Sequence, residues 1–175
     1  MAIWKIDQSH SEIKFKVKHL VISTVTGQFN NFDATVEANA SDFSDAKITF
    51  EADVNSIDTR NEQRDGHLKS ADFFDAENFP KISFASKSLT KKSDNEYLLK
   101  GDLTIKGVTK EVDLDVQFNG IVQGFGGGEV AGFEISGKIN RFDFGLQWNA
   151  LTETGGIVVG ADVKIEISAE LVKAS

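Results

Sequence analysis

Three arginines are the side chains of this sequence best suited to hold a carboxylate or a phosphate. Arg60, Arg64 and Arg141 are the only arginines among 19 basic residues, so lysine supplies most of the positive charge. A guanidinium offers a planar fork of donors that suits a carboxylate or a phosphate. Two interpretations stay open. Each arginine contacts the head group of a ligand, or it pairs with a carboxylate such as Asp65 or Asp143 and pins a loop.

The histidines form no recognisable catalytic or metal-binding motif. The chain has three of them, His10, His19 and His67, at spacings that match no zinc motif, and it has no cysteine. His19 extends an apolar strand face and is expected inside the fold, whereas His67 joins the arginines as a head-group or loop-pinning candidate. The run 7–11 contains Asp, Ser and His but lacks a nucleophile elbow. We therefore expect no catalytic residue, no metal site and no cofactor.

Composition excludes several classes of protein. The 175 residues carry a formal charge of −8, which gives the wrong field for nucleic-acid backbones and anionic lipid surfaces. The sequence has no apolar run long enough for a membrane-spanning helix. It also shows no basic segment followed by an apolar one at its start, so no secretion signal is visible. The expected location is the cytoplasm for the sequence as it stands, or the periplasm if a leader was removed.

Period-two alternation of apolar and polar residues dominates the chain and predicts β-strands with one dry face each. The clear strands are 13–17, 47–54, 108–118, 131–139 and 157–171, and the weaker ones are 29–38, 82–89 and 97–106. Short polar or glycine-rich links at 92–95 and 124–128 indicate antiparallel hairpins. Eight such strands form either a barrel or a sandwich, and the unusual length of the last strand favours a barrel.

One stretch, 55–81, lacks the alternation and is long enough to have a role of its own. We expect a short helix at 62–69, with Thr59 as its cap and Glu62 three residues later. Phe73, Phe74 and Phe79 follow before the only proline. The segment is interpreted as a plug in the barrel end, as a lid over a ligand entrance, or as both.

Phenylalanine supplies nearly all the aromatic character, with 14 Phe against one Tyr and two Trp. Phenylalanine rings require no hydrogen-bond partner. They fit either a filled core or an apolar chamber, and small inward residues such as Ala34 and Ala52 favour the chamber. The predicted lining residues are Phe15, Val17, His19, Phe50, Phe73, Phe74, Phe79, Phe84, Phe118, Phe133 and Val163.

Four segments resemble the YceI-like, polyisoprenoid-binding family. The first is Asp7-x-x-His10-Ser11-x-Ile13-x-Phe15, and the second is the central run from Ile57-Asp58-Thr59-Arg60-Asn61 through Arg64-Asp65-Gly66-His67 to Phe79-Pro80. The third is Gly101-Asp102-Leu103-Thr104-Ile105-Lys106-Gly107-Val108-Thr109-Lys110, and the fourth is Asn140-Arg141-Phe142-Asp143-Phe144-Gly145. Together they span nearly the whole chain. Many members of that family carry a secretion signal, and this sequence differs from them because no such signal is visible in it.

The resemblance implies an all-β fold, an antiparallel eight-stranded lipocalin-like barrel, as a single domain over residues 1–175. It also implies non-enzymatic binding, storage or transport of an amphipathic lipid, a polyisoprenoid or an isoprenoid quinone, in the barrel. Two alternatives remain: an enzyme or stress-response factor that uses the same pocket on a small apolar substrate, and an interaction module with a filled core. The expected partner is the lipid, with no nucleic acid and with homodimer formation left open.

Overall fold

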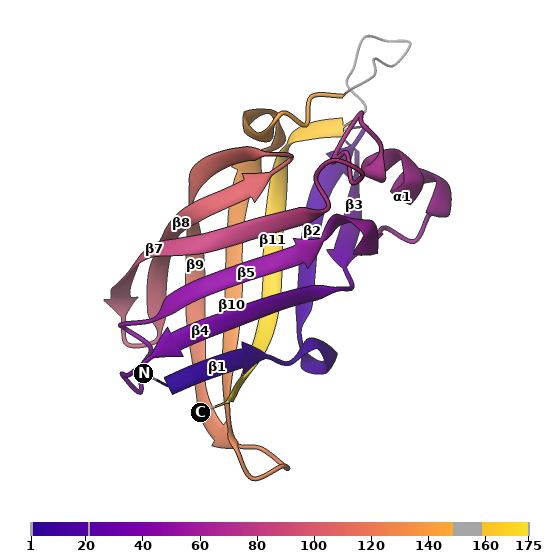
Figure 1. The fold of residues 1–175 in the computed structure, drawn as a ribbon. Coiled ribbons are helices and arrows are strands. Elements are labelled where there is room, and N and C mark those ends of the chain that lie inside the picture. The colour runs from indigo at the N-terminus through magenta and orange to yellow at the C-terminus, as the bar shows by residue number, and fades with distance from the viewer. Residues whose placement is uncertain (1, 21, 149–158, 175) are drawn as a thin grey trace.

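The computed structural model describes residues 2–20, 22–148 and 159–174, which form a tall barrel with one short α-helix at its upper end (Figure 1). The strands are β1 (Ala2–Ile6), β2 (Glu12–His19), β3 (Ser23–Phe29), β4 (Phe32–Ala38), β5 (Lys47–Asp53), β6 (Ile57–Asp58), β7 (Lys81–Ser93), β8 (Glu96–Ile105), β9 (Val108–Gln123), β10 (Glu129–Asn140) and β11 (Val159–Lys173). The helix is α1 (Glu62–Lys69), and three 3-10 turns are η1 (Gln8–His10), η2 (Val54–Ser56) and η3 (Arg141–Phe144).

Pairing of β11 with the start of the chain closes the sheet. β11 pairs antiparallel with β2 between Val159 and Ser168, and its last residues pair antiparallel with β1. Because β1 and β2 follow the same edge in the same direction, they are two parts of one ribbon interrupted by η1. Figure 1 shows this seam between the yellow and indigo ends of the chain.

Two further ribbons are interrupted in the same way. β3 and β4 are separated only by Asn30 and Asn31, and they pair with β2 and β1 respectively. β5 and β6 are separated by η2 and pair with β4 and β3. Counted as ribbons, the described residues form a closed antiparallel barrel of eight strands, which confirms the predicted fold class.

The alternation pattern missed β6 and most of β3, of which only Phe29 lay in a predicted strand, and it also missed β1. The inward residues of β1, Ala2, Trp4 and Ile6, face the core, but Ile3 on the other face hides the period. The two hairpin links are as expected, since the Gly124 amide donates to the Gly128 carbonyl (2.7 Å) in the β9–β10 turn. The last predicted strand began at 157, and its first two residues lie outside the described part of the chain.

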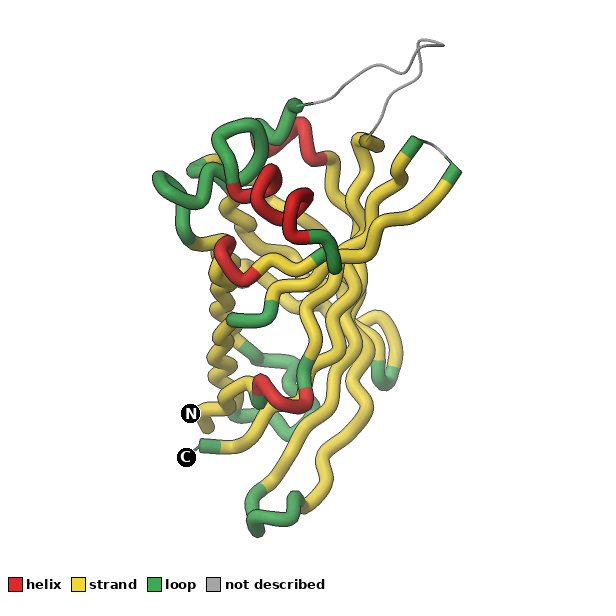
Figure 2. The backbone as a smooth tube through the Cα atoms, turned by 90° about the vertical axis from the view of Figure 1, so that its right-hand side faces the viewer, coloured by secondary structure: helices red, strands yellow, loops and turns green. Residues whose placement is uncertain are grey.

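The predicted helix is found at 62–69, but its cap is different. The side chain of Asn61, not that of Thr59, accepts a hydrogen bond from the Arg64 amide (3.0 Å). Asn at this position is as good a cap as Thr, and Thr59 is instead used in a contact with Asp65 described below. α1 lies at the end of the barrel opposite the two chain termini (Figures 1 and 2). No helix among the described residues is long and apolar enough to cross a membrane.

The link between β4 and β5 lies at the end of the barrel near the termini (Figure 1). Phe43 of this link is 2% exposed, and its ring centroid lies 5.0 Å from that of Trp4 and 5.0 Å from that of Phe133. Tyr97 fixes the link by donating its hydroxyl hydrogen to the Asp42 carbonyl. Phe43 has a φ of 63°, which is costly for a bulky residue. The aromatic packing must therefore hold this backbone conformation in place.

Removing the ring of Phe43 tests whether the aromatic packing around it stabilises this end of the barrel. Phe43→Ala is expected to lower the free energy of unfolding by about 3–5 kcal/mol, because it empties the centre of the aromatic cluster. Phe125, in the β9–β10 turn, is fully exposed, and Phe125→Ala is the matched control, with an expected change within about 0.5 kcal/mol. Urea titrations followed by circular dichroism measure both. Equal losses of unfolding free energy in the two variants would contradict this role of the Phe43 ring.

Candidate functional site

The barrel encloses a cavity of about 240 Å³. All of the surface that it exposes belongs to apolar atoms. The wall includes inward residues of almost every ribbon, among them Ile13, Val36, Phe50, Phe84, Leu103, Leu114, Ile135 and Ile165. An apolar chamber of this size lies between a cavity that holds a small aromatic molecule and an ordinary ligand pocket.

The cavity wall extends along most of the barrel. On β11 it begins at Val159, continues through Val163 and Ile167, and ends at Leu171, a stretch of about 40 Å at ~3.4 Å per residue. At the end near the termini the wall reaches Phe43, and at the end near α1 it reaches Leu68. Because a volume of about 240 Å³ extends along so long a wall, the cavity is narrow rather than round.

Glycines beneath large side chains help to keep this space open. Gly27 is paired with Phe15, and a Cβ built on Gly27 would lie 2.2 Å from the Phe15 ring. A Cβ built on Gly137 would likewise lie 2.4 Å from Cδ2 of Leu114. With no side chain beneath them, the ring and the Leu branch lie back over the sheet, and the lumen keeps the volume that they would otherwise fill.

Most of the predicted lining residues lie on this wall. They are Phe15, Val17, Phe50, Phe73, Phe74, Phe84, Phe133 and Val163. Sequence reasoning concentrated on phenylalanine and missed the aliphatic majority of the wall, such as Ile165 and Leu103, although the same alternation marks them. Whether any of these residues touches a ligand stays a prediction.

Three predicted lining residues lie off the wall. Phe118 packs behind it against Phe43 and Phe133, with ring centroids 5.3 and 5.1 Å away, next to the irregular pairing of β9 and β10. Phe79 covers Gly107 in the β8–β9 turn, where a Cβ on that glycine would lie 2.7 Å from its ring. His19 is half-buried at the end of β2, beyond the stretch that faces the lumen.

Arg141 is buried at the α1 end of the cavity wall, only 3% exposed. Its guanidinium donates to backbone carbonyls, from Nε to Gly160 (2.8 Å) and from one terminal nitrogen to Leu146 (2.5 Å) and Trp148 (2.9 Å). The second terminal nitrogen donates to the Val159 carbonyl at 3.2 Å. Burial lowers the pKa of this guanidinium below its ordinary value.

The hypothesis that Arg141 pairs with an aspartate is wrong for the described residues. No carboxylate lies within ion-pair distance of its guanidinium there, and its neighbour Asp143 is exposed. The carbonyls it binds belong to the segment after η3 and to the first residues of β11. Arg141 therefore ties two parts of the chain together at the cavity end and leaves a positive charge there without a counter-ion among the described residues.

The other two arginines have different settings. Arg64 donates from Nε to the Thr59 hydroxyl (2.8 Å) and from a terminal nitrogen to the Thr59 carbonyl (2.6 Å). Asp65 accepts from the amide (2.9 Å) and the hydroxyl (2.5 Å) of the same threonine. Arg64 and Asp65 thus both hold Thr59 and make no ion pair with each other. Arg60 is exposed, and its backbone has a φ of 63°.

His67 lies at the outer side of this end and not on the cavity wall. Its Nε2 is 2.9 Å from an oxygen of Asp72. The ring packs edge-on against Phe73 (5.1 Å between centroids) and Trp148 (4.7 Å). Since Phe73 itself lines the cavity, His67 supports the wall from behind.

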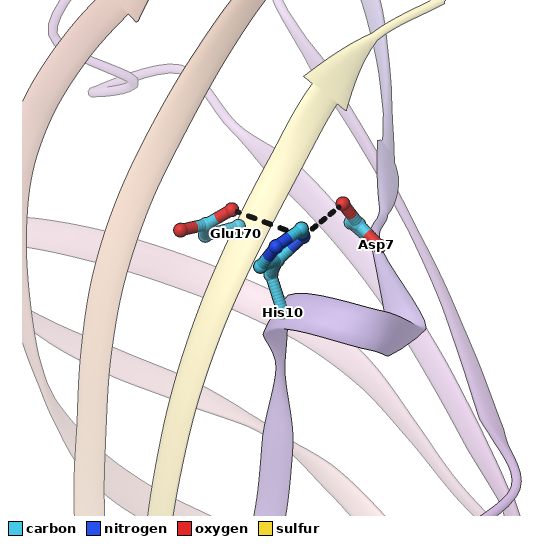
Figure 3. Close-up of side chains that lie close together, drawn as sticks. All are labelled: Asp7, His10 and Glu170. Carbon is cyan, nitrogen blue, oxygen red and sulfur yellow. Dashed lines mark hydrogen bonds and ion pairs between the residues drawn. The ribbon is translucent and has the colours of Figure 1, made fainter. Parts of the chain in front are cut away.

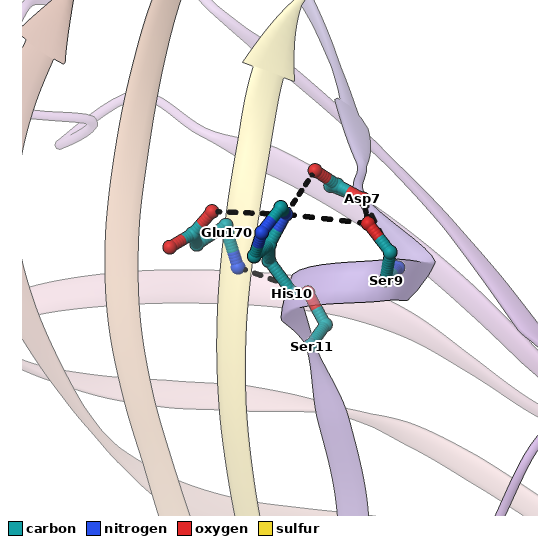
Figure 4. Close-up of polar contacts among 5 residues, drawn as sticks. All are labelled: Asp7, Ser9, His10, Ser11 and Glu170. Atoms are coloured by element: carbon teal, nitrogen blue, oxygen red, sulfur yellow. Dashed lines mark hydrogen bonds and ion pairs between the residues drawn. The ribbon is translucent and has the colours of Figure 1, made fainter. Parts of the chain in front are cut away.

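A polar cluster of Asp7, His10 and Glu170, called here the His10 cluster, lies where η1 interrupts the seam (Figure 3). His10 Nδ1 is 2.9 Å from Asp7 Oδ2 and 3.9 Å from Glu170 Oε2. Ser9 donates its hydroxyl hydrogen to Asp7 (2.7 Å), and the Ser11 hydroxyl accepts from the Glu170 amide (3.0 Å) (Figure 4). Hydrogen bonds to His10 and Ser9 lower the pKa of Asp7, and the bond to Asp7 raises the pKa of His10.

These pKa shifts predict a pH window for the His10 cluster. The raised pKa of His10 stabilises the fold below its ordinary value of 6.5, and this contribution is lost as pH rises through the folded pKa. The lowered pKa of Asp7 stabilises the fold above 3.8 and is lost as pH falls through the folded pKa. The Tm difference between the wild type and His10→Gln should therefore be largest between pH 3.8 and 6.5.

Thermal unfolding with a metal chelator present, repeated from acidic to alkaline pH, measures that difference. The advantage of the wild type should shrink at both ends of the series. A difference that stays constant with pH would mean that the cluster makes no charge-dependent contribution to the fold.

Gly27→Ala tests the origin of the open space. The new methyl group must displace the Phe15 ring, which lines the cavity. We expect a narrower cavity, with weaker uptake of an apolar fluorescent probe and a modest loss of Tm. Gly126→Ala is the control, because a Cβ there meets nothing within 4 Å. Unchanged probe binding in Gly27→Ala would refute the role of this glycine.

Comparison with known proteins agrees with the fold. A UPF0312 protein of Staphylococcus aureus (strain N315) is 46% identical over 171 residues, which cover 97% of each chain. Among solved structures, BcnA of Burkholderia cenocepacia superposes with a TM-score of 0.80 at 23% identity and covers 94% of this chain and 98% of its own. A polyisoprenoid binding domain from Saccharophagus degradans superposes at 0.68 with 13% identity, covering 98% of each.

The family profile of the YceI-like domain matches residues 4–171. That match begins in β1, ends in β11 and so includes both sides of the seam, as well as every segment on which the sequence resemblance was based. The chain belongs to the YceI-like family.

Proposed function

We propose that this protein binds one long-chain amphipathic lipid in the barrel cavity, with the tail along the apolar wall, and stores or carries it without changing it chemically. The proposed ligand class is a polyisoprenoid or an isoprenoid quinone. The observation that carries the proposal is the long, narrow and apolar cavity itself. Membership of the YceI-like family and the polyisoprenoid binding domain of similar fold support the ligand class.

The wall favours a chain over a compact molecule. Burial of one CH₂ group contributes about 0.8 kcal/mol, so a five-carbon isoprene unit contributes roughly 4 kcal/mol before losses. Association costs about 4–15 kcal/mol in lost freedom. One unit is therefore too little, whereas several units in a row can bind tightly with no polar contact. Affinity should grow with the length of the tail.

The α1 end is where we place the head group. Arg141 borders the cavity there, and its positive charge has no carboxylate partner among the described residues. An electron-rich head, such as a quinone carbonyl or a phosphate, is attracted to such a charge. Its donors already bind backbone carbonyls, so Arg141 would act mainly through charge rather than through a bidentate grip.

The placement of the titratable groups supports binding rather than chemistry. His19 and His67, the residues that a reaction in the pocket would most readily use, lie off the wall. Tyr97 lines the cavity, but its hydroxyl is used by the Asp42 carbonyl. No specific observation favours an enzyme over a carrier. The cytoplasmic location and the homodimer stay predictions.

A titration with geraniol, farnesol and geranylgeraniol tests the tail. The affinity should rise at each step, since each alcohol adds one isoprene unit to the same head. Competition with a fluorescent fatty probe gives the ranking. Equal affinities across the series would refute a tail that lies along the wall.

Two adjacent residues of β11 supply the matched variants. Val163 lines the cavity and Lys164 faces outward from the next position. Val163 pairs with Ile139, close to Arg141. Val163→Phe should therefore narrow the cavity near the proposed head-group end and weaken the binding of all three alcohols, whereas Lys164→Phe adds the same ring outside and should leave the series unchanged. The same response in both variants would place the ligand elsewhere.

A further inference from the structure

We propose that the His10 cluster is a binding site for a divalent transition-metal ion of the Zn²⁺ type, and that the ion clips the seam of the barrel. The site is formed by Nδ1 of His10, Oδ2 of Asp7 and Oε2 of Glu170, on the outside of the barrel (Figure 3). The inference does not rest on the proposed lipid function, because none of the three side chains lines the cavity.

The ligand atoms lie close to the separations that such an ion requires. Zn²⁺ binds histidine nitrogen and carboxylate oxygen at about 2.0–2.2 Å, so two ligands of a tetrahedral ion are about 3.4 Å apart. The His10 nitrogen is 2.9 Å from the Asp7 oxygen and 3.9 Å from the Glu170 oxygen. All three atoms lie within 4.8 Å of one another. Adjustments of the Glu170 and His10 side chains, which are both solvent-accessible, are enough to equalise these distances.

The charge of the site also points to a cation. In the part of the chain that the structure describes, neither Asp7 nor Glu170 has a lysine or arginine within ion-pair distance, and His10 is the partner of both. By contrast, Glu166, which lies four residues before Glu170 on the same face of β11, pairs with Lys16 at 3.1 Å. When His10 is neutral, the cluster holds two uncompensated negative charges, and a divalent ion would balance both.

The backbone brings the three residues together without help from an ion. The Asp7 amide donates to the Glu170 carbonyl (2.9 Å), so Asp7 and Glu170 are neighbours across the seam although they are far apart in sequence. The turn η1 positions His10, whose backbone amide donates a hydrogen bond to the Asp7 carbonyl at 3.2 Å. The ion would meet a site whose main chain is already fixed, which lowers the entropy cost of binding.

The donor set selects the class of metal. One imidazole and two carboxylates, with the exposed side left for water, suit Zn²⁺ and its transition-metal neighbours. Mg²⁺ and Ca²⁺ prefer about six to eight oxygen ligands and gain little from an imidazole. A bound ion would connect β11 to the segment between β1 and β2, so it would stabilise the closed barrel by mass action.

Isothermal titration calorimetry of the untagged full chain with ZnCl₂ at pH 7.5 tests the site. We expect one ion per chain, binding unaffected by excess Mg²⁺, and a Tm that rises with Zn²⁺ concentration. Because loss of even an outer partner of a metal ligand costs roughly tenfold to a hundredfold in affinity, His10→Ala should weaken binding by at least ~tenfold. Binding should also weaken at pH 5.5, where the proton competes for His10.

Glu170→Gln and His67→Ala complete the design. Glu170→Gln keeps the shape of the side chain and should weaken Zn²⁺ binding while the circular dichroism spectrum and lipid binding stay those of the wild type. His67→Ala removes the other described histidine that pairs with a carboxylate, Asp72, and should bind Zn²⁺ like the wild type. The proposal is overturned if the wild type shows no heat of binding at millimolar Zn²⁺. Wild-type affinity in both His10→Ala and Glu170→Gln would overturn it too, as would loss of binding in His67→Ala.

Discussion

The pairing of β11 with an interrupted first ribbon is the interaction on which the structure depends. A sheet of long strands with one apolar face must cover that face, and closure does so without a second sheet. Because the first ribbon is split by η1, β11 can pair with β2 over most of its length and with β1 at its end. The same closure creates the cavity and places the His10 cluster on the outer side of the barrel. The cavity and the cluster therefore both depend on the pairing of β11 with the first ribbon.

The second constraint is that the interior stays only partly filled. A barrel of eight strands is just wide enough for side chains to fill it or for one small ligand. Here Gly27 and Gly137 allow large side chains to lie back against the wall, while Phe43 and its ring neighbours close one end. Stability is thus concentrated in this closed end and in the sheet, and the middle of the barrel is left available for an apolar ligand.

Much of this could be read from the sequence, because alternation reports directly which face of a strand is dry. It located the long strands, the helix at 62–69 and eight of the eleven predicted lining residues. It failed where the position or role of a residue is not reflected in the alternation of apolar and polar side chains. β1 is short and has Ile3 on its outer face, and Phe118 belongs to the dry face but packs behind the wall. The roles of Thr59 and Arg141 depend on contacts with backbone groups, which leave no pattern in the sequence.

The nearness of Asp7 and His10 to Glu170 was also invisible in the sequence, since it exists only after the sheet closes. The central claim is that the closed barrel holds a lipid in its lumen. Native mass spectrometry of the protein purified from its own cells, followed by organic extraction, tests it most directly. The account predicts a complex of one chain with one long-chain isoprenoid lipid that is released on extraction. A spectrum that contains only the bare polypeptide, from cells rich in such lipids, would contradict it.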